Sequence, residues 1–446
     1  MSSLGTHIRK AFPRPSTPQL KAMVSAAFVS NLGSAFQAFA FTYLTYATTQ
    51  SALATVMVGV AYSLAFGVMA LPAGAVARRF SHRHVVIVVS IAKAAVYSAI
   101  LALELAGSLT VTAIIMASAA SGITSAVQFP CWKGLMRGYS AEGMLDETNA
   151  LFFSLNAVAS VAGALVGGFL LDAVGPAPLF AFNVASYVPV LIVMAMLPDP
   201  ADGAARPHRE SRPPRAARTA IAAMLASPAV RRAVIIVALL ELLAWPLIAL
   251  MPKVAAEVGP QAKIYGLLLA STYAGAALVG AMLRRMKGRR RYAVIIWFAT
   301  MGCGVAIFAV GAVGIAPFGT PVTLVSVALL LCAAGFTLAT AASVLNAVVQ
   351  LGVPRTVEGE VLGLFAITTL ITGSVGKVVQ GRLADVVTVW WLPLVGGCLL
   401  VVGVGAAWWR HQFRALDAAQ PDSPRAHGAV MDHAQGTVGA RTQRGG

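Results

Sequence analysis

The chain of 446 residues is 58% hydrophobic and 11% charged, and its mean hydropathy is +0.78. Soluble domains are about 25% charged, so this composition excludes a water-soluble globular protein and predicts a membrane protein. The net charge of +17 would suit a nucleic-acid partner, but the distribution of the basic residues, described below, argues against that class of protein.

Twelve apolar runs are long enough to cross the hydrocarbon core of a bilayer, which takes about 20 helical residues. We therefore expect an all-α membrane protein with twelve transmembrane helices. The first run is too long for a cleaved signal peptide and lacks a cleavage site. The runs lie near residues 22–47, 52–77, 84–105, 109–135, 150–172, 177–197, 230–250, 264–284, 292–315, 321–349, 361–383 and 389–409.

The basic residues are concentrated in alternate loops. The N-terminus, the even-numbered loops and the C-terminal tail hold 28 of the 33 Lys and Arg residues, and the odd-numbered loops hold three. By the positive-inside rule, both termini are expected to be cytoplasmic, as an even number of spans requires. This pattern predicts a multi-pass protein of the inner (cytoplasmic) membrane and no nucleic-acid partner.

Composition along the chain predicts two six-helix halves, at 1–197 and 230–410. The segment 198–229 is rich in Pro, Ala and Arg and has too little apolar content to fold on its own, so we interpret it as a cytoplasmic basic linker. The segment 411–446 is of low complexity and is expected to be a disordered cytoplasmic tail.

Two internal repeats relate the halves. Residues 163–172 read GALVGGFLLD and residues 376–385, 213 positions later, read GKVVQGRLAD. Residues 74–79 read GAVARR and residues 280–285, 206 positions later, read GAMLRR. Six spans return the chain to its starting side, so the copies have the same orientation, which is the parallel-repeat arrangement of transporters that rock about a midplane site.

The resemblance to a known family rests on three further segments. They are TTQSALA at 48–54, LDETNALFFSLNAVASVAGALVGGFL at 145–170 and VVQLGVPRTVEGEVLGLF at 348–365. In order and spacing the chain resembles the major facilitator superfamily, most closely the branch that includes the enterobactin exporter and macrolide efflux proteins. The resemblance implies two pseudo-symmetric six-helix halves that work by alternating access.

The loop after span two departs from the superfamily pattern Gly-x-x-x-Asp-Arg-x-Gly-Arg-Arg. The sequence GAVARRFSHR has Arg78 at the position of the Asp, which in the family helps to latch the halves in the outward-open state. Either Arg78 and Arg79 meet an acidic residue of the next cytoplasmic loop (Glu142, Asp146 or Glu147), or they only fix the topology. The candidate gate residues are Gly74, Arg78, Arg79, Arg83, Gly280, Arg284 and Arg285.

Glu241 is the main candidate for energy coupling. The chain has no phosphate-binding Gly-x-x-x-x-Gly-Lys-Ser/Thr loop, which leaves an ion gradient as the common energy source. Glu241 lies about 13 Å into span seven at 1.5 Å per residue, where a carboxylate costs at least about 2.5 kcal/mol and desolvation penalises its charged form. Pro246 offers a bend beside it. Glu241 either carries protons or binds a cationic substrate, or it is a structural glutamate bonded to a neighbouring helix.

The other polar residues within spans leave alternatives open. Lys377 could hold an anionic substrate, whereas Lys93, on a span that is peripheral in the family, is interpreted as a snorkelling or paired structural lysine. The uncharged candidates either line a cavity or form interhelical hydrogen bonds; they are Asn31, Gln37, Gln128, Asn156 and Asn346. Small residues expected to serve helix packing are Gly163, Gly167, Gly168 and Gly376.

The sequence therefore predicts a secondary transporter, with proton-driven export of a small amphipathic molecule such as a drug, siderophore or secondary metabolite. A lipid-like substrate such as a lysophospholipid is the alternative within that class. An enzyme is not expected, because the histidines lie in loops, in tails or at the very start of a span and the acidic residues are scattered. The four cysteines lack paired spacing, and we expect no cofactor or metal. The expected partners are the substrate, protons and the lipid bilayer, and the expected state is a monomer.

Overall fold

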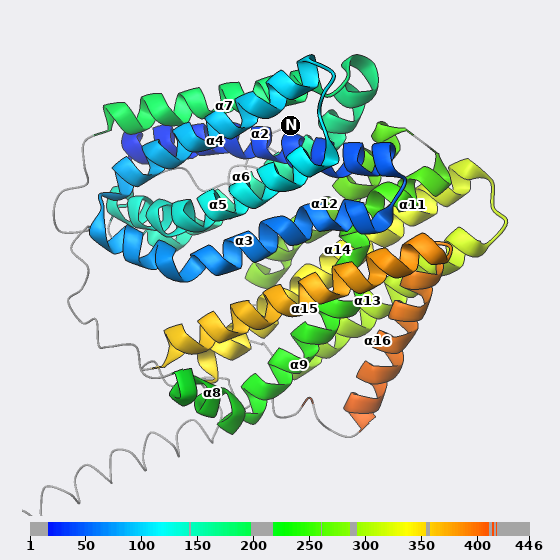
Figure 1. The fold of residues 1–446 in the computed structure, drawn as a ribbon. Coiled ribbons are helices and arrows are strands. Elements are labelled where there is room, and N and C mark those ends of the chain that lie inside the picture. The colour runs from blue at the N-terminus through cyan, green and yellow to red at the C-terminus, as the bar shows by residue number, and fades with distance from the viewer. Residues whose placement is uncertain are drawn as a thin grey trace, which may run out of the picture.

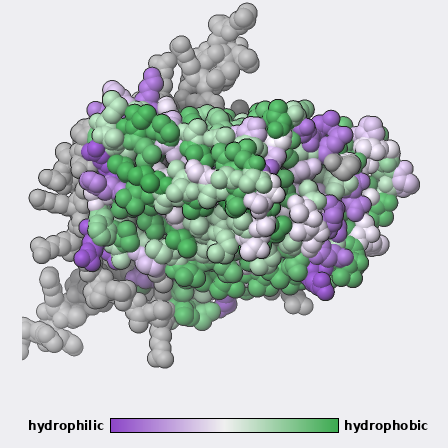
Figure 2. Space-filling view, turned by 45° about the horizontal axis from the view of Figure 1, so that its top comes forward, coloured by the Kyte–Doolittle hydropathy of each residue, from purple (hydrophilic) through white to green (hydrophobic). Residues whose placement is uncertain are grey.

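A computed structural model of the chain describes residues 17–141, 144–197, 217–259, 261–285, 292–353 and 357–409, together with 413 and 416. Twelve helices in these ranges are long and apolar enough to cross a membrane, the number expected from the sequence. Figure 2 shows a broad band of hydrophobic side chains between polar ends, the surface that a bilayer would cover.

The helices form two bundles (Figure 1). The N-terminal bundle contains α2 (Pro18–Thr49), α3 (Ala52–Arg79), α4 (His82–Leu105), α5 (Val111–Tyr139), α6 (Leu145–Val174) and α7 (Ala177–Met196). The C-terminal bundle contains α8 (Ala217–Ala226), α9 (Pro228–Leu243), α10 (Pro246–Ala249), α11 (Met251–Val258), α12 (Ala262–Arg285), α13 (Tyr292–Ile315), α14 (Thr320–Leu351), α15 (Glu358–Val386) and α16 (Trp391–Trp409).

Side-chain caps fix where several of these helices begin. The hydroxyls of Thr17, Ser51, Thr110 and Ser227 each accept a hydrogen bond from a backbone N–H of the first turn that follows. Such a cap satisfies one of the four backbone donors that have no partner at a helix start. Gly175 ends α6 with φ at +78°, a backbone conformation that glycine adopts without steric cost.

Two parts of the predicted linker and tail are ordered. The helix α8 lies within 198–229, and its sequence ARTAIAAMLA is rich in alanine, the residue of highest helix propensity. Its Met224 packs against the core of the C-terminal bundle. Phe413 and Leu416, in the predicted tail, are buried in the same core. These parts of the linker and tail pack because their apolar side chains, within otherwise polar segments, lie next to an apolar surface of the bundle.

The seventh span is a broken helix. The helix α9 ends at Leu243, and α10 and α11 follow it as short separate helices. Pro246 is the cause, because proline has no backbone N–H to bond the carbonyl four residues before it. The bend predicted at Pro246 from the sequence is thus confirmed.

The two bundles meet through two pairs of helices. The helix α6 packs on α12, and α3 packs on α15. Between α3 and α15, Ala52 and Leu53 at the start of α3 face Gly381, and Gly67 further along α3 faces Leu370. Between α6 and α12, the close contacts lie where α6 ends and α12 begins. We call this end of the molecule, where α3 and α12 begin, the closed end.

Candidate functional site

Glu241 lies on α9 one turn before the break. Its side chain is half-buried and lies against α15, because Gly373 leaves the space: a Cβ on Gly373 would come within 2.5 Å of the carboxylate oxygen Oε2. A Cβ on Gly376 would come within 2.8 Å of the Glu241 carbonyl oxygen. Two glycines of α15 therefore let the backbones of α9 and α15 approach closely at Glu241.

Lys377 follows Gly376 on α15 and carries the opposite charge. The Glu241 carboxylate and the Lys377 ammonium act on each other electrostatically. Both side chains are half-buried, and these two described groups form no direct ion pair. The site thus combines an acid and a base, partly compensated, at the packed face of α9 and α15.

Gln380 stabilises the break in α9. Its Nε2 donates to the carbonyl of Leu242 at 2.7 Å and to that of Leu243 at 3.3 Å. Leu242 is four residues before Pro246, so its carbonyl is the one that the proline leaves without a helical donor. The N–H of Leu247 bonds Ala244 instead of Leu243. One side chain of α15 therefore satisfies two of the carbonyls that the break frees, and the sequence alone gives no signal for this contact.

Gln37 takes part in a polar cluster inside the N-terminal bundle. It is 5% exposed, and its Oε1 accepts a short hydrogen bond from Asn183 Nδ2 of α7. Tyr97 and Tyr187 stack with ring centroids 6.1 Å apart. Gln37 therefore joins α2 and α7, the interhelical alternative of the two that the sequence left open.

Gln128 is placed beside the buried lysine of α4. The Lys93 Nζ donates to Gln128 Oε1 at 2.7 Å and to Ser125 Oγ at 3.1 Å. Lys93 is 8% exposed, so it does not snorkel to an interface but is paired with two neutral acceptors on α5.

The remaining uncharged candidates do not converge on Glu241. Asn31 on α2 is half-buried, and Asn156 on α6 and Asn346 on α14 are exposed. Asn346 Oδ1 accepts from Gln350 Nε2 at 3.2 Å, one turn away on the same helix. The structure brings together the charged candidates Glu241 and Lys377 and leaves the neutral ones on separate helices.

At the closed end, Asp385 near the end of α15 caps α3 of the other bundle. Its Oδ1 accepts from the Ala52 N–H at 2.6 Å, and its Oδ2 accepts from the Leu53 N–H at 3.2 Å and from Ser51 Oγ at 2.8 Å. Ser51 in turn accepts from the Ala54 N–H at 3.2 Å. A carboxylate at a helix N-terminus satisfies backbone donors and interacts favourably with the helix dipole.

Asp172 repeats this arrangement on the second pair of helices. It lies near the end of α6, and its two oxygens accept from the N–H groups of Ala262 and Lys263 at 2.9 Å each, at the start of α12. Asp172 and Asp385 end the internal repeat noted above, so the sequence carries a signal for this pair of caps, although the repeat by itself does not reveal their role.

Close packing surrounds both caps. A Cβ on Gly168 would come within 2.8 Å of the Ala262 carbonyl oxygen and within 3.2 Å of Gly266 Cα. The Phe39 and Tyr265 rings stack with centroids 4.5 Å apart across the bundle interface. The closed end is thus sealed by polar caps, glycine crossings and an aromatic stack.

The other predicted packing glycines also face neighbouring helices. Gly163 faces Ala35 of α2, and a Cβ on Gly167 would contact Phe36 at 3.2 Å. Both contacts lie within the N-terminal bundle.

The predicted gate residues are dispersed at the opposite end. Arg83 donates to the carbonyls of Met194 and, at 2.7 Å, Ala195, where α7 ends. Arg78 and Arg79 are exposed, and no ion pair joins them to the exposed Glu147 in the described part of the chain. A Cβ on Gly74 would come within 3.6 Å of the Arg78 side chain of its own helix, and Gly280 is exposed on α12. Glu142 and the side chains of Asp146, Arg284 and Arg285 lie outside the described residues.

The chain is a multi-pass membrane transporter with the major facilitator fold. Three features define this class of protein: twelve apolar spans in two bundles, a repeat in parallel orientation, and a helix broken beside an intramembrane acid. Residues 16–440 match the transmembrane secretion effector family of that superfamily, and the chain belongs to this family. No curated protein matches the sequence.

Solved structures share this fold at low sequence identity. A bacterial homologue of the human lysosomal transporter Spinster, inward-facing and unoccupied, aligns with a TM-score of 0.68 and 14% identity over 92% of this chain and 100% of that chain. A bacterial homologue of the iron transporter ferroportin, also inward-facing, gives 0.67 and 14% over 89% and 99%. A D-xylose–proton symporter gives 0.66 and 12% over 87% and 97%. The family and these structures are transporters.

Proposed function

We propose that the protein uses a proton gradient to export a small amphipathic molecule by alternating access, and that Glu241 carries the proton. The observation that carries this proposal is the position of the Glu241 carboxyl: it lies within a span, one turn before a helix break, with the Lys377 charge nearby. An intramembrane ionisable residue is by default a functional candidate.

The surroundings of Glu241 suit a change of protonation. With the carboxylate charged, Lys377 compensates it; with the acid neutral, Lys377 keeps a charge that a substrate anion or dipole can take up. The break at Pro246 frees the segment beyond α9 from continuous helical hydrogen bonding. A local charge change at Glu241 can therefore bias the position of α10 and α11 relative to α9.

The closed end supplies the gate in this proposal. Positive-inside topology makes it the outer end, so this arrangement of the helices corresponds to an inward-facing state. Reaching the outward-facing state requires both aspartate caps to be broken, because Asp385 and Asp172 each join an end of one bundle to a start of the other.

Direction and substrate are inferred from chemistry and family. Membership of a secretion family supports export. The site offers one acid and one base in apolar surroundings, which fits amphipathic solutes that carry a charge. We place the protein in the inner membrane as a monomer with both termini cytoplasmic.

The test is substrate-dependent proton movement in proteoliposomes that contain a pH-sensitive dye, with a panel of cationic, neutral and anionic amphiphiles that includes a lysophospholipid. We expect wild type to move protons with at least one compound and Glu241→Gln to lose that coupled movement. The matched control is Glu104→Gln, the same chemical change at the end of α4, which should behave as wild type.

Equal proton movement by wild type and Glu241→Gln would overturn the role of Glu241. Lys377→Gln is then the next variant, because Lys377 is the other charged group of the site. Loss of movement in Glu104→Gln as well would mean that removing an acid from a span harms the fold in general, and would also remove the support for Glu241.

A further inference from the structure

A lysine near the cytoplasmic end of α5 lies between two aromatic rings. The Lys133 Nζ is 5.6 Å from the ring centroid of Phe129 on the same helix and 5.1 Å from that of Phe153 on α6. Phe129 and Phe153 are 54% and 55% exposed, and Lys133 is half-buried. A cation over the face of an aromatic ring is attracted by the ring quadrupole, so the two rings hold the ammonium in place and keep free surface of their own.

A second pair of rings supports this arrangement from the core. Trp132 and Phe152 pack with ring centroids 6.4 Å apart, and Phe152 meets Phe153 edge-on at 6.3 Å. Trp132 and Phe152 are partly buried and pack against the core of the N-terminal bundle. The aromatic surface around Lys133 is therefore built on packed side chains of both α5 and α6.

Phe153 points toward the space between the two bundles. On α6, Gly168 faces α12 of the other bundle, and Gly167 faces α2. At 100° per residue, Phe153 lies about 60° from the direction of Gly168 and about 40° from that of Gly167, and so between them. Its exposed ring is therefore turned toward the bundle interface and not toward the lipid.

The ammonium of Lys133 keeps its N–H donors available. In the described part of the chain it forms no hydrogen bond and no ion pair. By contrast, Arg83 bonds carbonyls where α7 ends, and Lys93 bonds two acceptors on α5. Lys133 thus offers a positive charge that is held in position beside exposed aromatic surface.

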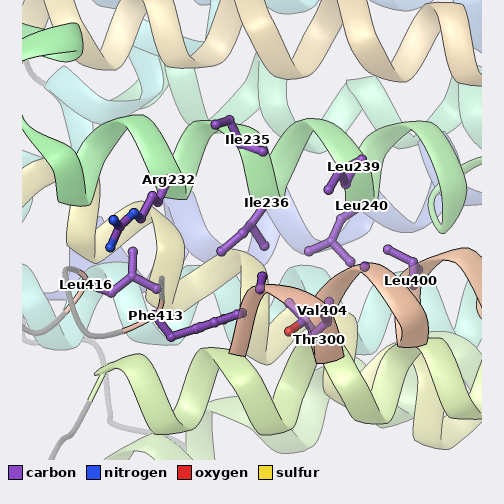
Figure 3. A pocket seen from close by; sticks show the side chains of 12 residues that line it. Arg232, Ile235, Ile236, Leu239, Leu240, Thr300, Leu400, Val404, Phe413 and Leu416 are labelled. Carbon is purple, nitrogen blue, oxygen red and sulfur yellow. The ribbon is translucent and has the colours of Figure 1, made fainter. Parts of the chain in front are cut away.

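The pocket between α9, α13 and α16 offers no comparable charge (Figure 3). Arg232 lies at its end but already has an interaction partner within the protein. The apolar walls are closed, since Leu240 and Leu400 are 2% and 3% exposed. A charged solute is therefore expected at Lys133 and not in this pocket.

A second base faces the bundle interface further from the cytoplasm. Leu370 of α15 faces Gly67 of α3, and Lys377 lies about 20° from Leu370 around α15 and about 10 Å along it toward the closed end. Two lysines, one from each bundle, are thus turned toward the same interface.

We propose that Lys133, Phe129 and Phe153 form the cytoplasmic entry site for the transported solute, and that this solute is an organic anion with an aromatic or other flat apolar body. The anionic group accepts from the Lys133 ammonium, and the body lies against the exposed surface of the rings. A cationic solute would be repelled by Lys133. The inference rests on the proposed function, because it assigns a charge to the solute that the protein exports.

The experiment measures binding of naphthalenesulfonate by isothermal titration calorimetry to the full-length protein in phosphatidylcholine nanodiscs, with empty nanodiscs as the blank. Wild type should bind it, and should bind the neutral naphthalenemethanol more weakly. Lys133→Gln should weaken sulfonate binding about tenfold, as expected for the loss of one charge-assisted contact. Lys133→Arg should retain binding, because arginine keeps the charge and stacks on aromatic rings. The matched control is Arg137→Gln, the same loss of charge on an exposed side chain one turn further along α5, which should bind as wild type does.

A second variant tests the ring and keeps the charge. Phe153→Leu should weaken sulfonate binding about fivefold through the loss of stacking. Its control is Phe169→Leu, because Phe169 is also on α6 and is 57% exposed but points about 160° away from Phe153 around the helix. This control should keep the wild-type affinity.

Three outcomes would overturn the proposal. They are wild type that binds no sulfonate, equal affinity of wild type and Lys133→Gln, and a loss of affinity in Arg137→Gln as large as in Lys133→Gln. Nanodiscs that contain phosphatidylglycerol separate a free solute from a lipid headgroup: unchanged affinity supports the solute, whereas loss of binding would assign the site to the headgroup and overturn the entry site. Because binding is measured without a gradient, a protein that binds the sulfonate but moves no protons would refute the proposed coupling and leave this inference standing.

Discussion

The Asp385 carboxylate accepts a hydrogen bond from the Ala52 backbone N–H at 2.6 Å, although the two residues are 333 positions apart and lie in different bundles. Asp172 and Ala262 repeat this relationship on the second pair of helices at 2.9 Å. In each case the end of one helix caps the start of another across the bundle interface. Opening this end requires a carboxylate to leave backbone donors that it satisfies.

Asp385→Asn should favour opening of the closed end. The amide keeps the shape of the carboxylate but loses its charge and one of its two acceptor oxygens. Loss of a negative charge at a helix N-terminus costs about 0.3–1 kcal/mol, equivalent to a shift of up to roughly fivefold in a two-state equilibrium. The measurement is the rate of maleimide labelling of Val56→Cys, a residue that is 0% exposed next to Gly381, after replacement of the native cysteines. Labelling should accelerate. Glu257→Gln, an exposed acid on α11, should leave it unchanged.

The two aspartate caps should act additively. Both hold the same end closed through separate helix pairs, so the free-energy changes of Asp172→Asn and Asp385→Asn should sum in the double variant. In the labelling assay the accelerations should therefore multiply. A double variant that labels no faster than either single variant would show that one cap alone controls this end.

Gly266→Ala should disturb the same interface by steric conflict. A Cβ on Gly266 would overlap the Ala164 carbonyl oxygen, while Gly363 has open space at its Cβ position. Because backbone cannot give way as a flexible side chain does, we expect faster labelling at Val56→Cys or a lower melting temperature in detergent. Gly363→Ala should be neutral or slightly stabilising, since alanine has the higher helix propensity.

Gln380→Leu should destabilise the protein, and Pro246→Ala should rescue it. The leucine leaves the freed carbonyl of Leu242 without its donor, which costs about 1–3 kcal/mol when the group is buried. Alanine at 246 restores an N–H that can bond that carbonyl within the helix. A double-mutant cycle on unfolding free energies measures the coupling. Simple additivity of the two changes would contradict the role given to Gln380.

The predicted gate residues, which lie at the end opposite to the closed end, contrast with these positions. The arginines in the loop after α3 were candidates because the family pattern has an Asp at the position of Arg78. Arg83 instead binds carbonyls where α7 ends, a contact typical of a basic residue near a helix C-terminus. The sequence placed this residue in a motif, but only packing showed that its partner is another helix end.

The amino-acid sequence by itself determined the twelve spans, the repeat between the two halves, the intramembrane acid at Glu241 and the break at Pro246. These features depend on local properties: the length of apolar runs against the bilayer thickness, the distribution of charge over loops and the missing N–H of proline. Each can be read within one helix or one loop, without knowledge of what that helix contacts.

Only the tertiary structure decided which polar residues meet. It paired Asp385 with Ala52 and Asp172 with Ala262, placed Gln380 on the broken helix, and turned Gln37 into the N-terminal bundle instead of toward Glu241. The physical reason is that a helix presents a side chain every 100°, and the face that meets a partner is set by the packing of two bundles whose contacting residues are hundreds of positions apart.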